Sequence, residues 1–324
     1  MSADNTGELA NIRVLVEIDG PVATLTLNRP DKRNAINMAM WASIEAHVSA
    51  LTANRDIRVL VVRGEGDHFC AGADISELTN GPGGEYARIN WAAEEALANF
   101  PGPTIAVIRG NCVGGGVSIA TACDIRISAD DALFGITPAK LGIVYPTNAL
   151  ERAVRVIGGS AAKHLMFTGE LIQSERALRI GLVDEVHSVT ALNNRVDELV
   201  ALLVERSALT QVATKAMIDE VVREGKVKPK TTLYWETEMD KSGEVREGVA
   251  AFLAKRPVRW PWKRSSFNFS VLLRKQNCFE DTKYIADVSE SVCTQHAGSN
   301  GTSVATYAIH DCWSLCSHFT EALA

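Results

Sequence analysis

The sequence predicts an α/β fold in which mostly parallel strands alternate with helices, followed by a helical C-terminal region. Apolar runs of strand length at 59–64 and 105–110 each lead into a glycine-rich turn, and the second turn opens into an apolar helical stretch. From Glu151 onward the hydrophobic pattern is almost entirely helical. Because strands joined through helices run parallel with right-handed crossovers, these observations favour a parallel sheet as the core.

Local patterns place the expected elements in order. Residues 13–28 hold two alternating apolar runs around Asp19 and Gly20, which is typical of a β-hairpin. Residues 38–53 carry Met40, Ile44, His47 and Leu51 at helical spacing and predict an amphipathic helix. The other expected elements are a strand over 59–64, a polar glycine-rich loop over 79–85, a helix over 91–100, a strand over 105–110, a helix over 117–123 and a short strand over 124–128.

Length and composition bound the class of protein. The chain has 324 residues, of which 46% are hydrophobic, so a sizeable core is available. Its formal net charge of -6 argues against nucleic acid as the main partner. No apolar run reaches the length of a membrane span, and residues 1–5 lack the apolar region of a signal peptide. We therefore expect no membrane partner and a cytoplasmic location.

Two glycine-rich turns carry the most information about function. They are residues 68–74 (His-Phe-Cys-Ala-Gly-Ala-Asp) and residues 111–116 (Asn-Cys-Val-Gly-Gly-Gly). Glycines at such a junction allow backbone N–H groups to point into a site, at the positive end of a helix. If the turns face each other, two N–H donors can stabilise one developing negative oxygen, which is an oxyanion hole. The second turn lacks the G-x-G-x-x-G spacing of a dinucleotide site, and the chain has no P-loop.

The ordered set of motifs resembles the crotonase superfamily, the enoyl-CoA hydratase/isomerase family. The matching segments are 28–37, 69–75, 114–124, 134–142, Gly169, Ala177, 181–183 and 247–257, within roughly residues 12–262. The resemblance implies a crotonase-like spiral ββα core and an acyl-CoA thioester as substrate, with no cofactor apart from the CoA of that substrate. It also implies that the oxyanion donors are the N–H groups of Ala73 and Gly115.

The domain organisation follows from the same resemblance. Residues 12–195 are expected to form the spiral catalytic core. Residues 196–262 are expected to form a helical region that makes a homotrimer or a dimer of trimers and carries part of the acyl site. Family members usually end near Trp262, so residues 263–324 are expected to be an atypical, poorly ordered tail. Its Cys and His residues His310, Cys312, Cys316 and His318 match no common zinc-finger spacing.

Two glutamates with which hydratases of this family hold and deprotonate water are absent. The first falls two residues after the third glycine of the second turn, where this chain has Ser118. The second would follow Phe-Gly-x-Pro, but residues 134–138 read Phe-Gly-Ile-Thr-Pro. A hydroxyl such as that of Ser118 or Thr137 has too high a pKa to replace a carboxylate unaided. The standard hydratase mechanism is therefore in doubt.

Tyr145 provides an alternative. The order Leu-Gly-x-x-Tyr at 141–145 resembles methylmalonyl-CoA decarboxylases of the same superfamily. Decarboxylation of a malonyl-type thioester needs no strong base, because carbon dioxide leaves and its electron pair enters an enolate held by the oxyanion hole. Tyr145 would orient the carboxylate, and Ile136, Ile143 and Val144 would desolvate it. The structural alternative is a tyrosine hydroxyl that satisfies a backbone group.

Three functions therefore stay open at this point. Enoyl-CoA hydration or dehydration is the broad family label, decarboxylation is the alternative, and a catalytically inactive acyl-CoA-binding relative is the second alternative. Asp74 is expected to cap a helix, Asp124 to be a buried, hydrogen-bonded turn carboxylate, and His68 to lie beside the oxyanion loop. If the chain is a hydratase, the missing acid or base is expected among Glu77, Glu85 and Tyr86.

Residues expected to contact CoA come from three segments: Lys32, Arg33, Ala35, Ala71, Asp74, Phe252 and Lys255. The cationic Lys32 and Arg33 suit the CoA phosphates. The resemblance implies that Ala35, Ala71 and Asp74 line the adenine and pantetheine path through backbone groups. Phe252 and Lys255 are expected either to complete the CoA pocket of a neighbouring subunit or to form a solvated helix end rich in Lys and Arg. No metal is expected, because the core has no His and Glu cluster at ligand spacing.

Overall fold

The computed structural model describes residues 13–78 and 83–264 of the chain. Its strands are β1 (Val14–Asp19), β2 (Val22–Leu27), β3 (Val59–Gly64), β4 (Thr104–Ile108), β5 (Asn111–Val113), β6 (Ile125–Ala129), β7 (Leu133–Gly135), β8 (Ile172–Gln173) and β9 (Glu185–His187). Its α-helices are α2 (Met38–Ala53), α3 (Gly84–Ala98), α4 (Gly115–Ala122), α5 (Thr147–Thr168), α6 (Ser174–Arg179), α7 (Leu192–Glu205), α8 (Ala208–Glu224), α9 (Pro229–Ser242) and α10 (Glu244–Leu253). Short 3₁₀ helices are η1 (Pro30–Lys32), η2 (Ile75–Glu77) and η3 (Pro138–Lys140).

The central sheet orders its strands β1-β2-β3-β4-β6-β9. β1 and β2 form an antiparallel hairpin, with Val14 opposite Leu27 and Asp19 opposite Val22. From β2 onward each neighbouring pair is parallel. The predicted hairpin and the predicted parallel core are both confirmed. Because β3 and β4 are parallel neighbours, the turns that follow them leave the sheet at the same edge.

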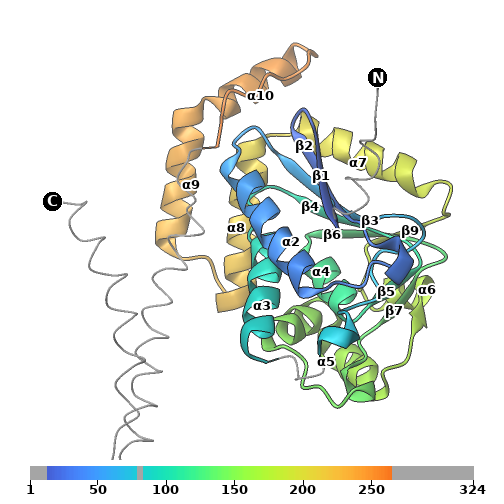
Figure 1. Cartoon of the computed structure of the whole chain (residues 1–324). Coiled ribbons are helices and arrows are strands. Elements are labelled where there is room, and N and C mark those ends of the chain that lie inside the picture. The colour runs from blue at the N-terminus through green and yellow to red at the C-terminus, as the bar shows by residue number, and fades with distance from the viewer. Residues whose placement is uncertain (1–12, 79–82, 265–324) are drawn as a thin grey trace, which may run out of the picture. The chain divides into compact units, whose positions relative to one another are not determined.

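Alternate residues of the central strands enter two separate hydrophobic cores. Leu60 and Val62 of β3 face the larger core, which contains the buried side of α2. Val59 and Val61 face a second core with residues of α7. The sheet is therefore covered on both faces, as Figure 1 shows for α2 and α7, and this explains why its strands read as continuous apolar runs.

Several boundaries differ from the expected ones. α3 begins at Gly84 and not at Trp91, so Glu85 and Tyr86 lie on a helix rather than in a loop. Residues 111–113, expected to be part of a turn, form β5, which belongs to a small sheet ordered β5-β7-β8. Beyond Glu151 the chain also contributes β8 and β9. These strands are two or three residues long, too short to give a pattern of alternation.

The C-terminal helices α8, α9 and α10 follow the sheet, and Figure 1 shows them at one side of it. A small core forms around Leu209, Ala213 and Trp235, and Trp262 packs against it. α7 runs across the expected boundary between residues 195 and 196. The expected trimer stays a prediction. The expected tail, including its Cys and His residues, lies outside the described residues apart from Lys263 and Arg264.

In the described ranges, no helix combines the length and the apolar character that crossing a membrane requires.

Candidate active site

The two glycine-rich turns meet at the sheet edge. Cys70 and Cys112 form a parallel bridge, with hydrogen bonds from Cys70 N–H to Asn111 O and from Val113 N–H to Cys70 O. A Cβ on Gly116 would lie 2.4 Å from Cys70 O, so only glycine permits this approach. A Cβ on Gly115 would lie 3.3 Å from the backbone nitrogen of Ala73. The two predicted turns are therefore in direct contact.

The N–H groups of Ala73 and Gly115 are the unpaired donors of this contact. Their neighbours are engaged: Asp74 N–H donates to Ile36 O, and Gly114 N–H donates to Gly135 O, each at 2.8 Å. Within the described part of the chain, no acceptor is found for the N–H of Ala73 or of Gly115. Gly115 is also the first residue of α4, where the helix dipole favours negative charge. The arrangement can bind one anionic oxygen through two backbone donors.

Aromatic side chains border the donor pair. A Cβ on Gly115 would lie 3.2 Å from a ring carbon of Trp41, and the Trp41 indole N–H donates to the Tyr86 hydroxyl at 3.0 Å. Burial raises the pKa of Tyr86 to about 12. Tyr86 is thus a neutral phenol bonded to Trp41, which does not suit it to act as a base near neutral pH.

Glu94 of α3 is a buried carboxylate that sequence reasoning missed. It is 1% exposed and accepts hydrogen bonds from Asn90 at 3.1 Å, Asn148 at 2.9 Å and Arg152 at 2.9 Å. Burial raises its pKa, while the nearby Ser118 hydroxyl and the charge of Arg152 oppose the shift. The carboxylate therefore lies beside Ser118, the position at which the matched motif lacks its first glutamate.

The side chains of Ser118 and Tyr145 both reach the second glycine turn. The Ser118 hydroxyl donates to Gly115 O at 2.9 Å, and the Tyr145 hydroxyl donates to Gly114 O at 3.2 Å. Burial and the nearby Glu94 charge raise the pKa of Tyr145, and the neighbouring Ser118 hydroxyl opposes this. In the structure the Tyr145 hydroxyl satisfies a backbone carbonyl, which is the structural alternative stated above for this residue.

Thr137 lies just before η3 and is partly buried, and its hydroxyl has no hydrogen bond within the described residues. Its neighbour Ile136 is buried, as expected of a desolvating wall. Val144 is 91% exposed, so its expected part in such a wall stays a prediction.

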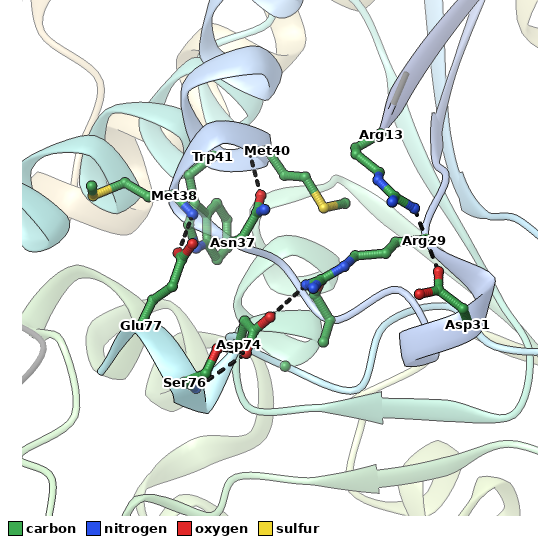
Figure 2. A network of polar contacts seen from close by, with 12 residues as sticks. Arg13, Arg29, Asp31, Asn37, Met38, Met40, Trp41, Asp74, Ser76 and Glu77 are labelled. Carbon is green, nitrogen blue, oxygen red and sulfur yellow. Dashed lines mark hydrogen bonds and ion pairs between the residues drawn. The ribbon is translucent and has the colours of Figure 1, made fainter. Parts of the chain in front are cut away.

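The expected reserve acids are engaged elsewhere. Glu77 accepts a hydrogen bond from Met38 N–H at 2.6 Å and so caps α2, as Figure 2 shows. Glu85 lies in solvent, 3.8 Å from Arg88. These contacts do not support Glu77 or Glu85 as the missing catalytic acid, whereas Glu94 is buried and lies beside Ser118.

The side chains of His68 and Asp124 accept hydrogen bonds from backbone N–H groups. The Nδ1 atom of His68 accepts from Asn111 N–H at 3.1 Å and so joins the two turns. Asp124 accepts from Thr104 N–H at 2.8 Å and from Lys215 at 2.6 Å. Asp124 is hydrogen-bonded as predicted, but the residue is exposed and not buried.

The segments expected to contact CoA lie side by side. Ala71 N–H donates to Arg33 O at 2.9 Å, and Ile36 N–H donates to Gly72 O at 2.8 Å. This pairing brings the loop that carries Lys32, Arg33 and Ala35 next to Ala71 and Asp74. Lys32 and Arg33 are both exposed. Phe252 lies in the last turn of α10 and is 82% exposed, and Lys255 follows the end of that helix. Figure 1 places α10 beyond α9, away from α4.

Asp74 fixes the loop that carries the Ala73 donor. It accepts from Ser76 N–H at 3.1 Å and caps η2, as predicted, and it pairs with Arg29 at 2.6 Å (Figure 2). Hydrogen bonding from Ser76 and Arg29 lowers the pKa of Asp74 to about 2. The expected CoA contact of Asp74 stays a prediction.

The lowered pKa of Asp74 makes its contribution to stability depend on pH. A carboxylate whose pKa is lower in the folded state stabilises the fold above its ordinary pKa of 3.8, and this contribution is lost as the pH falls through about 2. Asp74→Asn is expected to lower the unfolding free energy by about 1 kcal/mol at pH 7, after discounting for screening. The difference should shrink as the pH approaches 2.

Urea unfolding at pH 7 and at a pH near 2 measures the difference in unfolding free energy between wild type and Asp74→Asn. Asp31→Asn is the matched control, because Asp31 is exposed and pairs with Arg13 at 3.4 Å. A difference between wild type and Asp74→Asn that is equal at both pH values would contradict the assignment.

Among the described residues, no group of three or more His, Cys, Asp or Glu side chains is placed to hold a metal ion.

Comparisons with known proteins agree with the motifs. The family model described as enoyl-CoA hydratase/isomerase matches residues 17–263. Human mitochondrial Delta(3,5)-Delta(2,4)-dienoyl-CoA isomerase is 33% identical over 210 residues, which are 60% of this chain and 63% of that protein. The match thus spans less than two thirds of that relative. A short-chain-enoyl-CoA hydratase of Clostridium acetobutylicum is 30% identical over 253 residues, 76% of this chain and 96% of that one.

A solved structure shares the architecture. The enoyl-CoA hydratase of Bacillus anthracis superposes with a TM-score of 0.70 at 27% identity, covering 77% of this chain and 99% of that one.

Proposed function

Because the chain belongs to the enoyl-CoA hydratase/isomerase family and has the crotonase fold, we propose that it is an enzyme acting on an acyl-CoA thioester. The N–H groups of Ala73 and Gly115 donate to the thioester oxygen and stabilise the enolate formed during the reaction. The observation that carries this proposal is the contact between the two glycine turns, at which neither N–H group has an acceptor among the residues that the structure describes. Such donors act where negative charge develops and need no rearrangement at the moment of reaction.

Hydration or dehydration of an enoyl-CoA is the first candidate reaction. The relatives named above include an enoyl-CoA hydratase and a dienoyl-CoA isomerase. In this proposal Glu94 supplies the carboxylate that is missing at the two family positions, where this chain has Ser118 and Pro138. Support comes from its burial, its raised pKa and its position close to Ser118. A carboxyl group with a raised pKa suits general acid–base catalysis near neutral pH.

Decarboxylation of a malonyl- or methylmalonyl-type thioester is the second candidate. In this reaction the bond between Cα and the carboxylate breaks, carbon dioxide leaves, and the electron pair enters the enolate. No base is required, which fits the absence of both family glutamates. Tyr145, whose hydroxyl lies 3.2 Å from Gly114 O, is the side chain that would orient the substrate carboxylate.

The binding of CoA and the assembly are part of the same proposal. Lys32 and Arg33 are exposed cations beside the paired loops and suit the CoA phosphates. Ala35, Ala71 and Asp74 lie along those loops. In a homotrimer or a dimer of trimers, Phe252 and Lys255 would complete a neighbouring subunit's pocket, and the exposure of Phe252 suits such a contact. We place the enzyme in the cytoplasm.

Mass spectrometry of the enzyme with a mixture of crotonyl-CoA and methylmalonyl-CoA tests the reaction class. Hydration is expected to add water to crotonyl-CoA, and Glu94→Gln should slow it by about 10²-fold, because it removes the acid–base group. Decarboxylation would instead release carbon dioxide from methylmalonyl-CoA and would be insensitive to the charge of Glu94. Glu95→Gln is the matched control, since Glu95 is the neighbouring residue and also pairs with Arg152.

An inactive relative gives a third, distinct result. It would bind both thioesters without turnover, and the catalytic part of the proposal would then be wrong. Any turnover that Gly115→Pro abolishes would exclude that reading, because the proline removes the Gly115 donor.

A further inference from the structure

The peptide unit between Gly114 and Gly115 joins the proposed oxyanion hole to the protein interior. Its N–H is the Gly115 donor. Its carbonyl, that of Gly114, points the opposite way, because the peptide bond is trans. This carbonyl accepts from the Tyr145 hydroxyl at 3.2 Å and from Ser118 N–H at 3.1 Å. A group that hydrogen-bonds to the carbonyl therefore acts on the donor at the other end.

We propose that Tyr145 is a positioning residue for the oxyanion hole, whose hydroxyl orients and polarises the 114–115 peptide and so strengthens the Gly115 N–H donor. The inference rests on the proposed function, since it requires a thioester oxygen at that N–H. Hydrogen bonds in a chain polarise one another, by about 10–30% per bond in condensed-phase estimates. In this role Tyr145 assists hydration and decarboxylation equally, because both pass through the same enolate.

The local backbone needs such support. Gly114 has φ 53° and ψ -112°, a conformation that side chain-bearing residues avoid, and no side chain caps the eight-residue helix α4 that follows. The orientation of the first N–H of α4 is therefore not fixed by the usual capping contact. Tyr145, reaching in from the segment before α5, supplies a contact on the carbonyl side of the same peptide.

The two donors differ in what holds them. The peptide that carries the Ala73 N–H has Gly72 O as its carbonyl, which accepts from Ile36 N–H at 2.8 Å. That support comes from the backbone and does not depend on residue type. The corresponding carbonyl at Gly114 has a tyrosine hydroxyl as its partner outside α4. Side-chain substitution can therefore tune the Gly115 donor and leave the Ala73 donor unchanged.

The surroundings of Tyr145 keep its hydroxyl as a hydrogen-bond donor. Burial raises the pKa of Tyr145, and the charge of Glu94 raises it further. The neighbouring Ser118 hydroxyl opposes the shift without reversing it. The tyrosine stays neutral over the range in which an acyl-CoA enzyme works. A tyrosinate could only accept, and it would repel the Gly114 carbonyl.

The infrared carbonyl stretch of a bound thioester measures how strongly the two oxyanion donors polarise that carbonyl. Butyryl-CoA labelled with ¹³C at the thioester carbonyl is the probe, because it has no double bond to hydrate and no carboxylate to lose. Its infrared band is expected to shift to lower frequency on binding to the wild-type enzyme. Tyr145→Phe, which keeps the ring, should reduce this shift and lower kcat by about 3- to 10-fold with KM nearly unchanged. Tyr234→Phe, on α9, is the control and should change neither.

The outcomes separate this inference from the proposed function. A full band shift and an unchanged kcat in a folded Tyr145→Phe variant would overturn the inference and leave the oxyanion hole in place. Loss of decarboxylation with hydration unaffected would also overturn it, because Tyr145 would then act on the substrate carboxylate. If the wild type produces no band shift and Ala73→Pro changes nothing, the proposed function itself fails.

Discussion

Replacing Ala73 by proline is expected to lower the turnover of the acyl-CoA substrate by about 10²- to 10³-fold, because proline has no N–H and one oxyanion donor is lost. The fold should tolerate the loss of this N–H, since no acceptor for it exists in the described residues. The bonds on either side, from Ile36 N–H to Gly72 O and from Asp74 N–H to Ile36 O, do not involve the Ala73 nitrogen. The measurement is kcat and KM with the thioester identified by mass spectrometry, together with thermal unfolding.

Ala73→Ser is the matched control for this substitution. It keeps the N–H and adds one small polar atom, so its kcat should stay within a few-fold of wild type. If Ala73→Pro unfolds at the wild-type temperature and still turns over at the wild-type rate, Ala73 is not a donor.

Replacing Arg152 by methionine is expected to lower the unfolding free energy by about 3–5 kcal/mol at pH 7. Arg152 is 11% exposed and contacts both Glu94, at 2.9 Å, and Glu95. Methionine preserves much of the apolar volume of the side chain but leaves the Glu94 carboxylate buried without a counter-ion. The cost arises from that uncompensated charge and not from a lost attraction alone. Urea unfolding of the variant and of wild type measures it.

The sign of the pH dependence follows from Glu94. Its pKa is already raised above 4.5 by burial, and loss of Arg152 raises it further. A carboxyl whose pKa is higher in the folded state costs stability above that pKa, and the cost disappears as the pH falls below the ordinary value. The defect of Arg152→Met should therefore be largest at neutral pH and should shrink in acid.

Two further variants complete this experiment. Adding Glu94→Gln to Arg152→Met should restore most of the lost stability, because the buried group is then neutral. Arg155→Met on the same helix should cost at most about 0.5 kcal/mol, since Arg155 and Glu151 form an exposed pair. A double variant as unstable as Arg152→Met would mean that lost packing, and not charge, is the cause.

The elements with a strong local pattern could be predicted from the sequence. The hairpin of β1 and β2, the helix over Met38–Ala53 and the strand over Val59–Gly64 lie where the pattern placed them. Each is long enough for several repeats of its hydrophobic period. The contact between the two glycine turns was also predictable, because turns that follow neighbouring parallel strands leave the sheet at one edge.

Glu94 could not be predicted in the same way. A glutamate within a helix is typical of a solvent-facing position, and its partners Asn148 and Arg152 lie 54 and 58 residues further along the chain. No spacing rule connects such distant residues. The weak signal available was that Asn90 and Glu94 share a helix face. That signal was lost because α3 was expected to begin at Trp91, after Asn90.

The contact between the loops has a consequence for how the molecule folds. Ile36 pairs with Ala73 and Cys70 pairs with Cys112, so each contact closes a long stretch of chain at a cost in loop entropy. Neither pairing joins nearby residues, and the paired segments extend from β2, β3 and β4, so we expect these strands to be in register first. The donors should therefore be assembled late in folding. Local opening of these loops would separate the donors while the sheet stays intact, so a chain can keep its fold and lose its activity.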